Sequence, residues 1–370
     1  MSQVMPIQER DASPATIKVL RPKLPTSAQL LPYLERIDSA RTYSNYGPLN
    51  GEFARRLGDL VGGSHTTLTS NGTTAIELAL RLRCEQGGHC LMPAFTFIAS
   101  AHAVCNAGLT PYLLEADPDT LALTPEIATA ALKSVPGPVA AVLVVSAFGA
   151  PPDFAAWADF EARHGIPVVF DAAAALTSLS GIGQQPVCVS LHATKTLGIG
   201  EGGAIFCADQ ALMERATAMT GFGFAGQERL SSLRAGNYRI SEYAAAVGLA
   251  ALDGLPARLQ EMSDLTAAYA SRLEGKAVQL QRGVGTDWVT MTLNVMVPAA
   301  DLAATLARLD DAKVEWRRWW GLGCHRHPAF KDVPRSDLSA TDALAPRVIG
   351  LPFHADLSAG DLDRVTGCLQ

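Results

Sequence analysis

The sequence lacks any run of basic residues and any long apolar segment. Its 30 Lys and Arg residues stand against 36 Asp and Glu, giving a formal net charge of −6. Without a basic patch, we expect neither nucleic acid nor an anionic membrane surface as a partner. The longest apolar stretch, residues 139–145, is far too short to cross a bilayer. These absences favour a small soluble ligand as the partner.

The sequence also lacks any cysteine pattern that would serve a structural purpose. Its 7 cysteines are scattered and include no CxxC pair, which indicates neither a disulfide framework nor a zinc ribbon. Cys324, His325 and His327 have no spaced partner ligands, so we predict no metal site. The polar segment 1–13 lacks the apolar core of a signal peptide. We therefore expect a protein of the reducing cytoplasm.

The 370 residues are enough for two domains. From about residue 64 to 252, helical patterns alternate with short apolar runs, which is typical of an α/β domain with a mostly parallel sheet. After Pro256 the pattern is that of a smaller α+β domain. We predict a large domain over 47–255, a small C-terminal domain over 256–370, and an N-terminal segment, 1–46, that packs with the small domain.

The apolar runs and helical periodicities place individual elements. The predicted strands of the large domain are residues 89–92, 111–115, 140–146, 167–171, 187–191 and 203–207. Its predicted helices include 73–82, 99–107 and 150–164. In the small domain we predict helices at 257–274 and 300–311, a terminal helix opening at Ser358, and strands near 278–282 and 289–297.

One lysine stands between two apolar runs, inside a glycine-rich turn. Lys195 follows the predicted strand 187–191 and precedes the predicted strand 203–207. Desolvation lowers the pKa of an ammonium group and frees its nitrogen as a nucleophile. The segment therefore suits a lysine that forms a Schiff base, although an ordinary surface lysine on a loop is also compatible with it.

Three other segments could meet the same ligand. Gly72 and Thr73 begin a predicted helix, whose free N–H groups and positive end would suit an anion, although a capped helix explains the motif equally well. Asp171 closes a buried strand, where open α/β sheets bind ligands, or it is a turn residue. Phe97 could stack on a planar ring or belong to the core.

Together, the four segments supply what pyridoxal 5′-phosphate (PLP) requires. This cofactor needs a lysine for its aldehyde, a carboxylate that keeps the pyridine nitrogen protonated, an anion cup for its phosphate and an aromatic face against its ring. Lys195, Asp171, the turn at Gly72 and Phe97 match these needs in turn. We therefore predict PLP as the cofactor.

With these segments in place, the chain resembles the DegT/DnrJ/StrS family of nucleotide-sugar aminotransferases, which are fold-type I PLP enzymes, from about Arg21 to the C-terminus. Ordered stretches carry the resemblance: residues 43–48, 69–75, 93–101, 117–121, the strand of Asp171, 190–203 and 236–242. The resemblance implies a large mixed, mostly parallel sheet sandwiched by helices, with a smaller α+β C-terminal domain. It also implies transfer of an amino group, from glutamate as in the family, to a nucleotide-linked keto-deoxy sugar.

The resemblance assigns roles to individual residues. Lys195 and Asp171 become the catalytic pair, Phe97 stacks on the ring, and the phosphate is held by Gly72, Thr73 and Ser190. Asn237 would reach the phosphate in the neighbouring subunit, which implies a homodimer with shared active sites. For the substrate, the resemblance points to His192, for which a structural histidine is the alternative. It also points to a polar loop, for which a solvated loop with two packed tryptophans is the alternative: Arg317, Arg318, Trp319, Trp320, His325 and His327.

The sequence departs from the family at two places. Ala174 stands where the family has Gln or His in contact with the cofactor's phenolic oxygen, and the connection from Asp171 to Lys195 is a few residues shorter than usual. Ala174 leaves a non-catalytic regulator of the same fold as an alternative. A sugar dehydratase of this fold typically has histidine at the lysine position, so Lys195 favours amino transfer.

A nicotinamide oxidoreductase is a further alternative, because residues 221–226 satisfy GxGxxG. The fingerprint requires a strand directly before the first glycine. Here a helical pattern over 210–219 precedes it instead. The motif is therefore weak support for a dinucleotide site.

Overall fold

A seven-stranded sheet in the order β1-β7-β6-β5-β4-β2-β3 forms the centre of the large domain. The computed structural model describes residues 15–225 and 229–369. The strands are β1 (His65–Thr69), β2 (His89–Pro93), β3 (Thr110–Leu114), β4 (Val139–Val145), β5 (Val168–Asp171), β6 (Val187–Ser190) and β7 (Gly203–Cys207). β7 pairs antiparallel with β1 and β6, and the other pairings in this sheet are parallel. The predicted mostly parallel sheet is confirmed.

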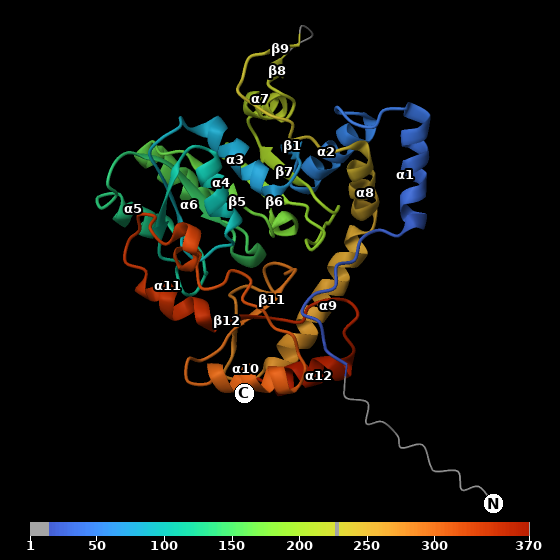
Figure 1. Ribbon diagram of the computed structural model, residues 1–370. Helices are drawn as coiled ribbons and strands as arrows, with labels where there is room; N and C mark the ends of the chain where they lie inside the picture. The colour runs from blue at the N-terminus through green and yellow to red at the C-terminus, as the bar shows by residue number, and fades with distance from the viewer. Residues whose placement is uncertain (1–14, 226–228, 370) are drawn as a thin grey trace, which may run out of the picture.

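Helices cover both faces of this sheet (Figure 1). One face packs against α2 (Pro48–Leu60), α5 (Pro125–Ala131), α6 (Phe154–His164) and α8 (Glu242–Asp253). The other packs against α3 (Gly72–Arg83), α4 (Ala99–Asn106) and α7 (Gln210–Thr220). Along β4, Val142 and Val144 face the first layer while Leu143 faces the second. Two buried faces explain why these strands are apolar throughout.

Two of the differences from the sequence prediction have a clear local cause. β1 was not predicted, because its buried residues include the polar Thr67 and so do not form an apolar run. The hydroxyl of Thr67 donates to the carbonyl of Met213 at 3.1 Å, which allows this polar group to be buried. α6 begins at Phe154 and not at residue 150. Two prolines precede Asp153, whose side chain accepts from the N–H of Ala156 and sets the start of the helix.

The small domain is built on a three-stranded antiparallel sheet of β10 (Gln279–Leu280), β11 (Leu293–Met296) and β12 (Val348–Leu351). Its helices are α9 (Leu255–Leu273), α10 (Leu302–Asp311), α11 (Ser339–Leu344) and α12 (Ala359–Gly367). α9 follows α8 after a single residue and leads the chain out of the large domain (Figure 1).

The N-terminal segment contacts both parts of the molecule. Ile17 pairs with Val314 and lies in the core of the small domain. The helix α1 (Ser27–Ala40) instead lies along α8 (Figure 1). We retain the boundaries 1–46, 47–255 and 256–370 as a proposal.

Candidate active site

A cavity of about 460 Å³ lies at the carboxyl ends of β4, β5 and β6. It brings together most of the predicted site residues: Gly72, Thr73, Phe97, Asp171, Ser190, His192, Lys195 and Trp319. These residues come from separate strands, helix starts and loops of both domains. The sequence predicted that these residues share a site, and the structure places them around one cavity.

Asp171 is held rigidly at the end of β5. Ser100 Oγ donates to Asp171 Oδ2 at 2.6 Å, and the N–H of Ala173 donates to Oδ1 at 3.1 Å. Ser100 Oγ in turn lies 3.0 Å from Thr96 Oγ1. Burial raises the pKa of Asp171, while these two hydrogen bonds and the charge of Lys195 act in the opposite direction. A cationic group placed against this carboxylate would relieve the cost of its burial.

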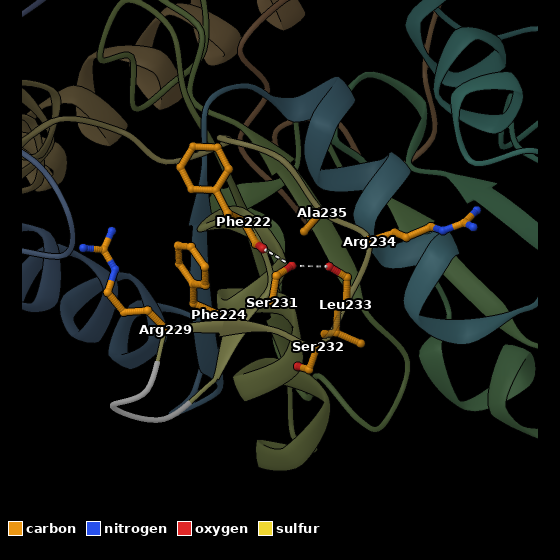
Figure 2. A pocket seen from close by; sticks show the side chains of 8 residues that line it. All are labelled: Phe222, Phe224, Arg229, Ser231, Ser232, Leu233, Arg234 and Ala235. Carbon is orange, nitrogen blue, oxygen red and sulfur yellow. Dashed lines mark hydrogen bonds between the residues drawn. The ribbon is translucent and has the colours of Figure 1, made fainter.

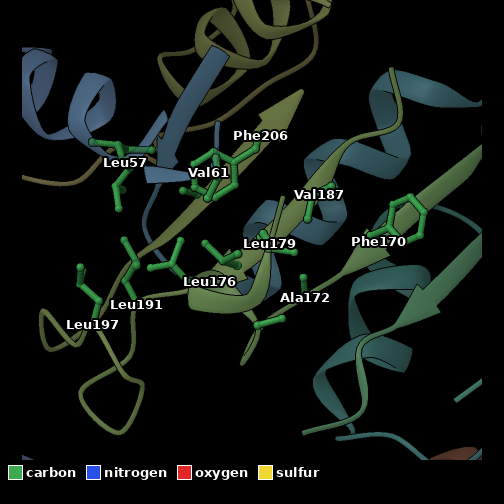
Figure 3. Packing of buried hydrophobic residues seen from close by; sticks show 14 of the residues in the cluster. Leu57, Val61, Phe170, Ala172, Leu176, Leu179, Val187, Leu191, Leu197 and Phe206 are labelled. Atoms are coloured by element: carbon green, nitrogen blue, oxygen red, sulfur yellow. The ribbon is translucent and has the colours of Figure 1, made fainter. Parts of the chain in front are cut away.

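Lys195 lies in the turn after β6, which pairs in parallel with β5. The turn is anchored on both sides of the lysine by Leu191 and Leu197, which are fully buried and pack into the large-domain core (Figure 3). The N–H of Lys195 donates to the carbonyl of His192 at 2.8 Å. Burial lowers the pKa of Lys195, although the charge of Asp171 opposes this effect. A larger neutral fraction makes the amine a better nucleophile.

The turn before α3 can receive an anion. Asn71 caps the helix by accepting from the N–H of Thr74 at 2.8 Å. The N–H groups of Gly72 and Thr73, at the start of the helix, have no intrahelical acceptor. A Cβ at position 72 would lie 2.9 Å from Ser190 Cβ, so only glycine lets the turn and Ser190 approach this closely. The backbone N–H groups of Gly72 and Thr73, the hydroxyl of Ser190 and the N-terminus of α3 thus form one anion-binding cup.

Phe97 and His192 face the cavity and not the core. The side chain of Phe97 is 56% exposed, which rules out the alternative of a core phenylalanine. His192 Nδ1 lies 2.9 Å from Thr194 Oγ1, and Nε2 lies 3.7 Å from Glu201 Oε1. Both rings are therefore available to a ligand.

The polar loop after β11 and α10 divides into two parts. Trp319 lines the cavity, beside Trp320, which stacks on Phe148 with ring centroids 4.0 Å apart. His325 and His327 are not among the residues that line it. His325 Nε2 lies instead 2.8 Å from Asp342 Oδ1 on α11. His325 is thus engaged by α11, and the predicted substrate contacts of both histidines stay a prediction.

Asn237 also lies outside this cavity. Its Oδ1 accepts from Arg239 Nε at 3.0 Å, and its backbone pairs with Gly221. Its predicted role, in the site of a second subunit, therefore stays a prediction. Ala174 does line the cavity and offers it no polar group, so the departure noted in the sequence is a real feature of the site.

Ser100 and Arg317 are polar residues of the cavity to which sequence reasoning gave no individual role. Ser100 lies within a stretch that carries the family resemblance, but only the packing of α4 shows that it hydrogen bonds to Asp171. Arg317 was assigned only to a polar loop, and the structure places it on the cavity wall while its neighbour Arg318 lies outside.

A second hollow, of about 790 Å³, lies beside the hairpin of β8 (Phe224–Ala225) and β9 (Leu230–Ser231) (Figure 2). Phe222, Arg229 and Arg234 are among the residues that line it. The hairpin projects from α7, on the side of the molecule opposite the small domain (Figure 1). α7 ends directly before Gly221, so the GxGxxG segment has no strand before it, and its last glycine, Gly226, lies outside the described residues.

Two features of other kinds of protein are absent from the described residues. Over 15–225 and 229–369, no three His, Cys, Asp or Glu side chains gather as metal ligands. No helix within these same ranges has the length and apolar character needed to cross a membrane.

A family model and individual relatives match almost the whole chain. The model of the DegT/DnrJ/EryC1/StrS aminotransferase family matches residues 26–370. Protein Rv3402c of Mycobacterium tuberculosis is 31% identical, over 96% of this chain and 89% of its own length. The dTDP-4-amino-4,6-dideoxy-D-glucose transaminase of Shigella dysenteriae is 26% identical, over 96% of this chain and 98% of its own.

Solved structures agree in fold. A putative PLP-dependent aminotransferase from Bacillus cereus superposes with a TM-score of 0.88 at 26% identity, covering 96% of this chain and 99% of its own. DesI, solved in the presence of its TDP-sugar product, gives a TM-score of 0.86 at 30% identity, covering 95% of this chain and 92% of its own.

These relatives imply PLP, and the cavity fits it on its own geometry. The cup at Gly72 suits a phosphate, and the buried carboxylate of Asp171 suits a protonated ring nitrogen. The desolvated amine of Lys195 suits an aldehyde, and Phe97 offers an aromatic face.

Proposed function

The chain belongs to the DegT/DnrJ/EryC1/StrS aminotransferase family, and on that premise we propose that it moves an amino group from glutamate to a nucleotide-linked keto-deoxy sugar with PLP as cofactor. The observation that carries the proposal is the presence of Lys195 and Asp171 in one cavity, at the ends of paired strands. A lysine in this place also favours amino transfer over the dehydratase alternative.

In the proposed reaction, each residue of the site would have a separate role. When bound, PLP supplies an aldehyde that accepts an amino group and a ring that delocalises electrons. Asp171 holds the proton on the ring nitrogen, and Ser100 fixes the orientation of that carboxylate. Lys195 Nζ would move the proton from the α carbon of the amino donor to the cofactor in one half of the cycle, and from the cofactor to the sugar carbon that receives the amino group in the other half. Leu191 and Leu197 keep the lysine turn in place.

The direct test uses the purified protein loaded with PLP. Glutamate alone should bleach the visible absorbance band, and a panel of nucleotide-linked 3-keto and 4-keto sugars should contain one member that restores it. Mass spectrometry of that mixture should show an amino sugar. A protein that binds no PLP, or that keeps its band with every amino acid, would exclude the proposal.

The anion cup gives a first prediction. Gly72→Val should raise the dissociation constant for PLP by roughly tenfold or more, because the added Cβ would press on Ser190 and open the cup. Absorbance titration of the PLP-free protein measures it. Gly51→Ala is the matched control, since a Cβ there has nothing within 4 Å. Equal affinities for PLP in both variants would contradict the role of the cup.

We further propose that the protein is a homodimer with shared active sites. Exposed aromatic side chains form two groups that share the segment 43–46: Tyr43 stacks on Tyr243, and Arg239 lies over the rings of Tyr46 and Phe222. Exposed aromatic residues and arginine are typical of protein interfaces. This surface leads to Asn237, whose side chain bonds Arg239 and which the proposal places in the partner's site.

A charge placed in that surface should weaken the dimer. Tyr243→Asp should shift the protein toward monomer in sedimentation velocity, with the dimer dissociation constant raised about tenfold or more, because an aspartate would be desolvated at the interface. Leu24→Asp serves as the control, since Leu24 is a 39% exposed apolar residue outside this surface. An unchanged dimer in Tyr243→Asp would place the interface elsewhere.

A further inference from the structure

One arginine of the cavity has no role in the proposed chemistry so far. Arg317 lies between α10 and the loop that carries Trp319, in a segment whose backbone hydrogen bonds to the small-domain sheet. Its N–H donates to the carbonyl of Gly350 at 3.0 Å, and the N–H of Gly350 donates back to the carbonyl of Arg317 at 2.7 Å. This double contact with β12 fixes the backbone from which the side chain extends.

The side chain of Arg317 has its charge free for a ligand. It is exposed, lines the cavity with Lys195 and Asp171, and its guanidinium carbon lies 5.2 Å from the ring centroid of Trp319. Among the described residues it forms no ion pair. Stacking on an indole limits the conformations of a guanidinium and leaves its in-plane N–H groups available.

The other arginines of this loop are engaged elsewhere. Arg318 Nε donates to the carbonyl of Pro346 at 2.9 Å, and its guanidinium lies over Trp316. Arg326 pairs with Asp342 at 2.6 Å. Neither residue lines the cavity. The adjacent pair Arg317 and Arg318 therefore offers one cation inside the site and a matched one outside it.

We propose that Arg317 binds a carboxylate of the amino donor through two parallel N–H contacts, an inference that rests on the proposed aminotransferase function. A planar guanidinium fork matches the geometry of a carboxylate. The carboxylates already in the cavity do not take this place, since Asp171 is bonded by Ser100 and Ala173 and Glu201 lies nearest His192. Glu315, whose charge interacts with that of Arg317, is itself paired with Lys18 at 2.6 Å, which leaves the two parallel N–H groups of Arg317 for a carboxylate of the ligand.

The geometry favours the donor's carboxylate over the diphosphate of the sugar nucleotide. The amine and the α-carboxylate of an amino acid share one carbon, so a donor that reacts beside Lys195 brings its carboxylate into the same cavity. A diphosphate is separated from the reacting carbon by the sugar ring, and it carries more charge than one guanidinium balances. Arg317 is the one arginine among the cavity's lining residues.

The test measures the glutamate half of the cycle alone, in the PLP-loaded protein, by the rate at which the visible band is lost. Arg317→Gln should raise the glutamate concentration for half-maximal rate by roughly 10- to 100-fold. Arg317→Lys should recover part of the loss, since it restores the charge without the fork. Arg318→Gln should behave as wild type.

A second substrate separates recognition of the carboxylate from general damage. Isoglutamine, in which an amide replaces the α-carboxylate of glutamate, should react poorly with the wild type, and Arg317→Gln should erase most of the preference for glutamate. A general defect would lower both rates together and keep their ratio, which would overturn the inference. Titration with UDP, GDP and TDP, followed by tryptophan fluorescence, provides the other arm. Nucleotide affinity lost in Arg317→Gln with an unchanged glutamate response would assign the residue to the diphosphate and equally overturn the inference.

The inference and the proposed function can fail separately. If the wild type responds to glutamate and the Arg317→Gln curve coincides with it, the inference alone is wrong. If no amino acid bleaches the wild-type band, the proposed function is wrong and the inference falls with it.

Discussion

Lys195→Ala is expected to abolish amino transfer, with turnover reduced on the order of 10⁴-fold or more. The cavity offers no second lysine, so no other amine can bond to the cofactor's aldehyde or move the proton at the donor's α carbon. The visible band of the PLP-loaded protein should be lost or displaced in the same variant. Absorbance spectra and a coupled assay of 2-oxoglutarate release measure the two effects.

The loss should not come from unfolding. Lys195 occupies a turn whose position is set by Leu191 and Leu197 and not by the lysine side chain. The melting temperature of the PLP-free variant should therefore stay close to that of the wild type. Lys133→Ala, at an exposed lysine outside the cavity, is the control. Substantial turnover in Lys195→Ala would remove the basis of the proposed mechanism.

Asp171→Asn is expected to have the second largest effect on catalysis. An amide cannot hold the proton on the ring nitrogen by charge, so the ring accepts electrons less readily and turnover should fall on the order of 10³-fold. The shape of the site should persist, because the asparagine side chain is nearly isosteric. Asp38→Asn, at an exposed position on α1, is the control. Rates within a few-fold of wild type would contradict the role of Asp171.

The same substitution should stabilise the PLP-free protein. Burial raises the pKa of Asp171 above its ordinary value of 3.8, so between that value and the folded-state pKa the folded protein binds more protons than the unfolded chain. Stability therefore falls as pH rises through this interval. At pH 7 we expect Asp171→Asn to raise the free energy of unfolding by about 1–3 kcal/mol, with the advantage shrinking toward pH 4.

Urea unfolding of the PLP-free proteins at several pH values measures this effect. A variant that is more stable yet nearly inactive would show that the buried carboxylate is kept for function at a cost to the fold. Equal stability of the two proteins at all pH values would mean that Ser100 and Ala173 fully compensate its burial.

The local pattern around the site was predictable because its chemistry follows short-range rules. An apolar run that ends in aspartate, and a small polar turn that opens a helix, place Asp171 and Gly72 at the ligand edge of a parallel sheet before any packing is known. The prediction failed where a buried strand contains hydrogen-bonded threonine, as in β1, because burial of a satisfied polar group leaves no apolar signal.

The sequence by itself determined the fold class, the family and the two groups, Lys195 and Asp171, on which the proposed chemistry depends. Only the tertiary structure decided that Ser100 holds Asp171, that Arg317 lines the cavity, and that His325 pairs with Asp342. The reason is physical: periodicity and turn composition act over a few residues, whereas these contacts depend on how separate segments pack.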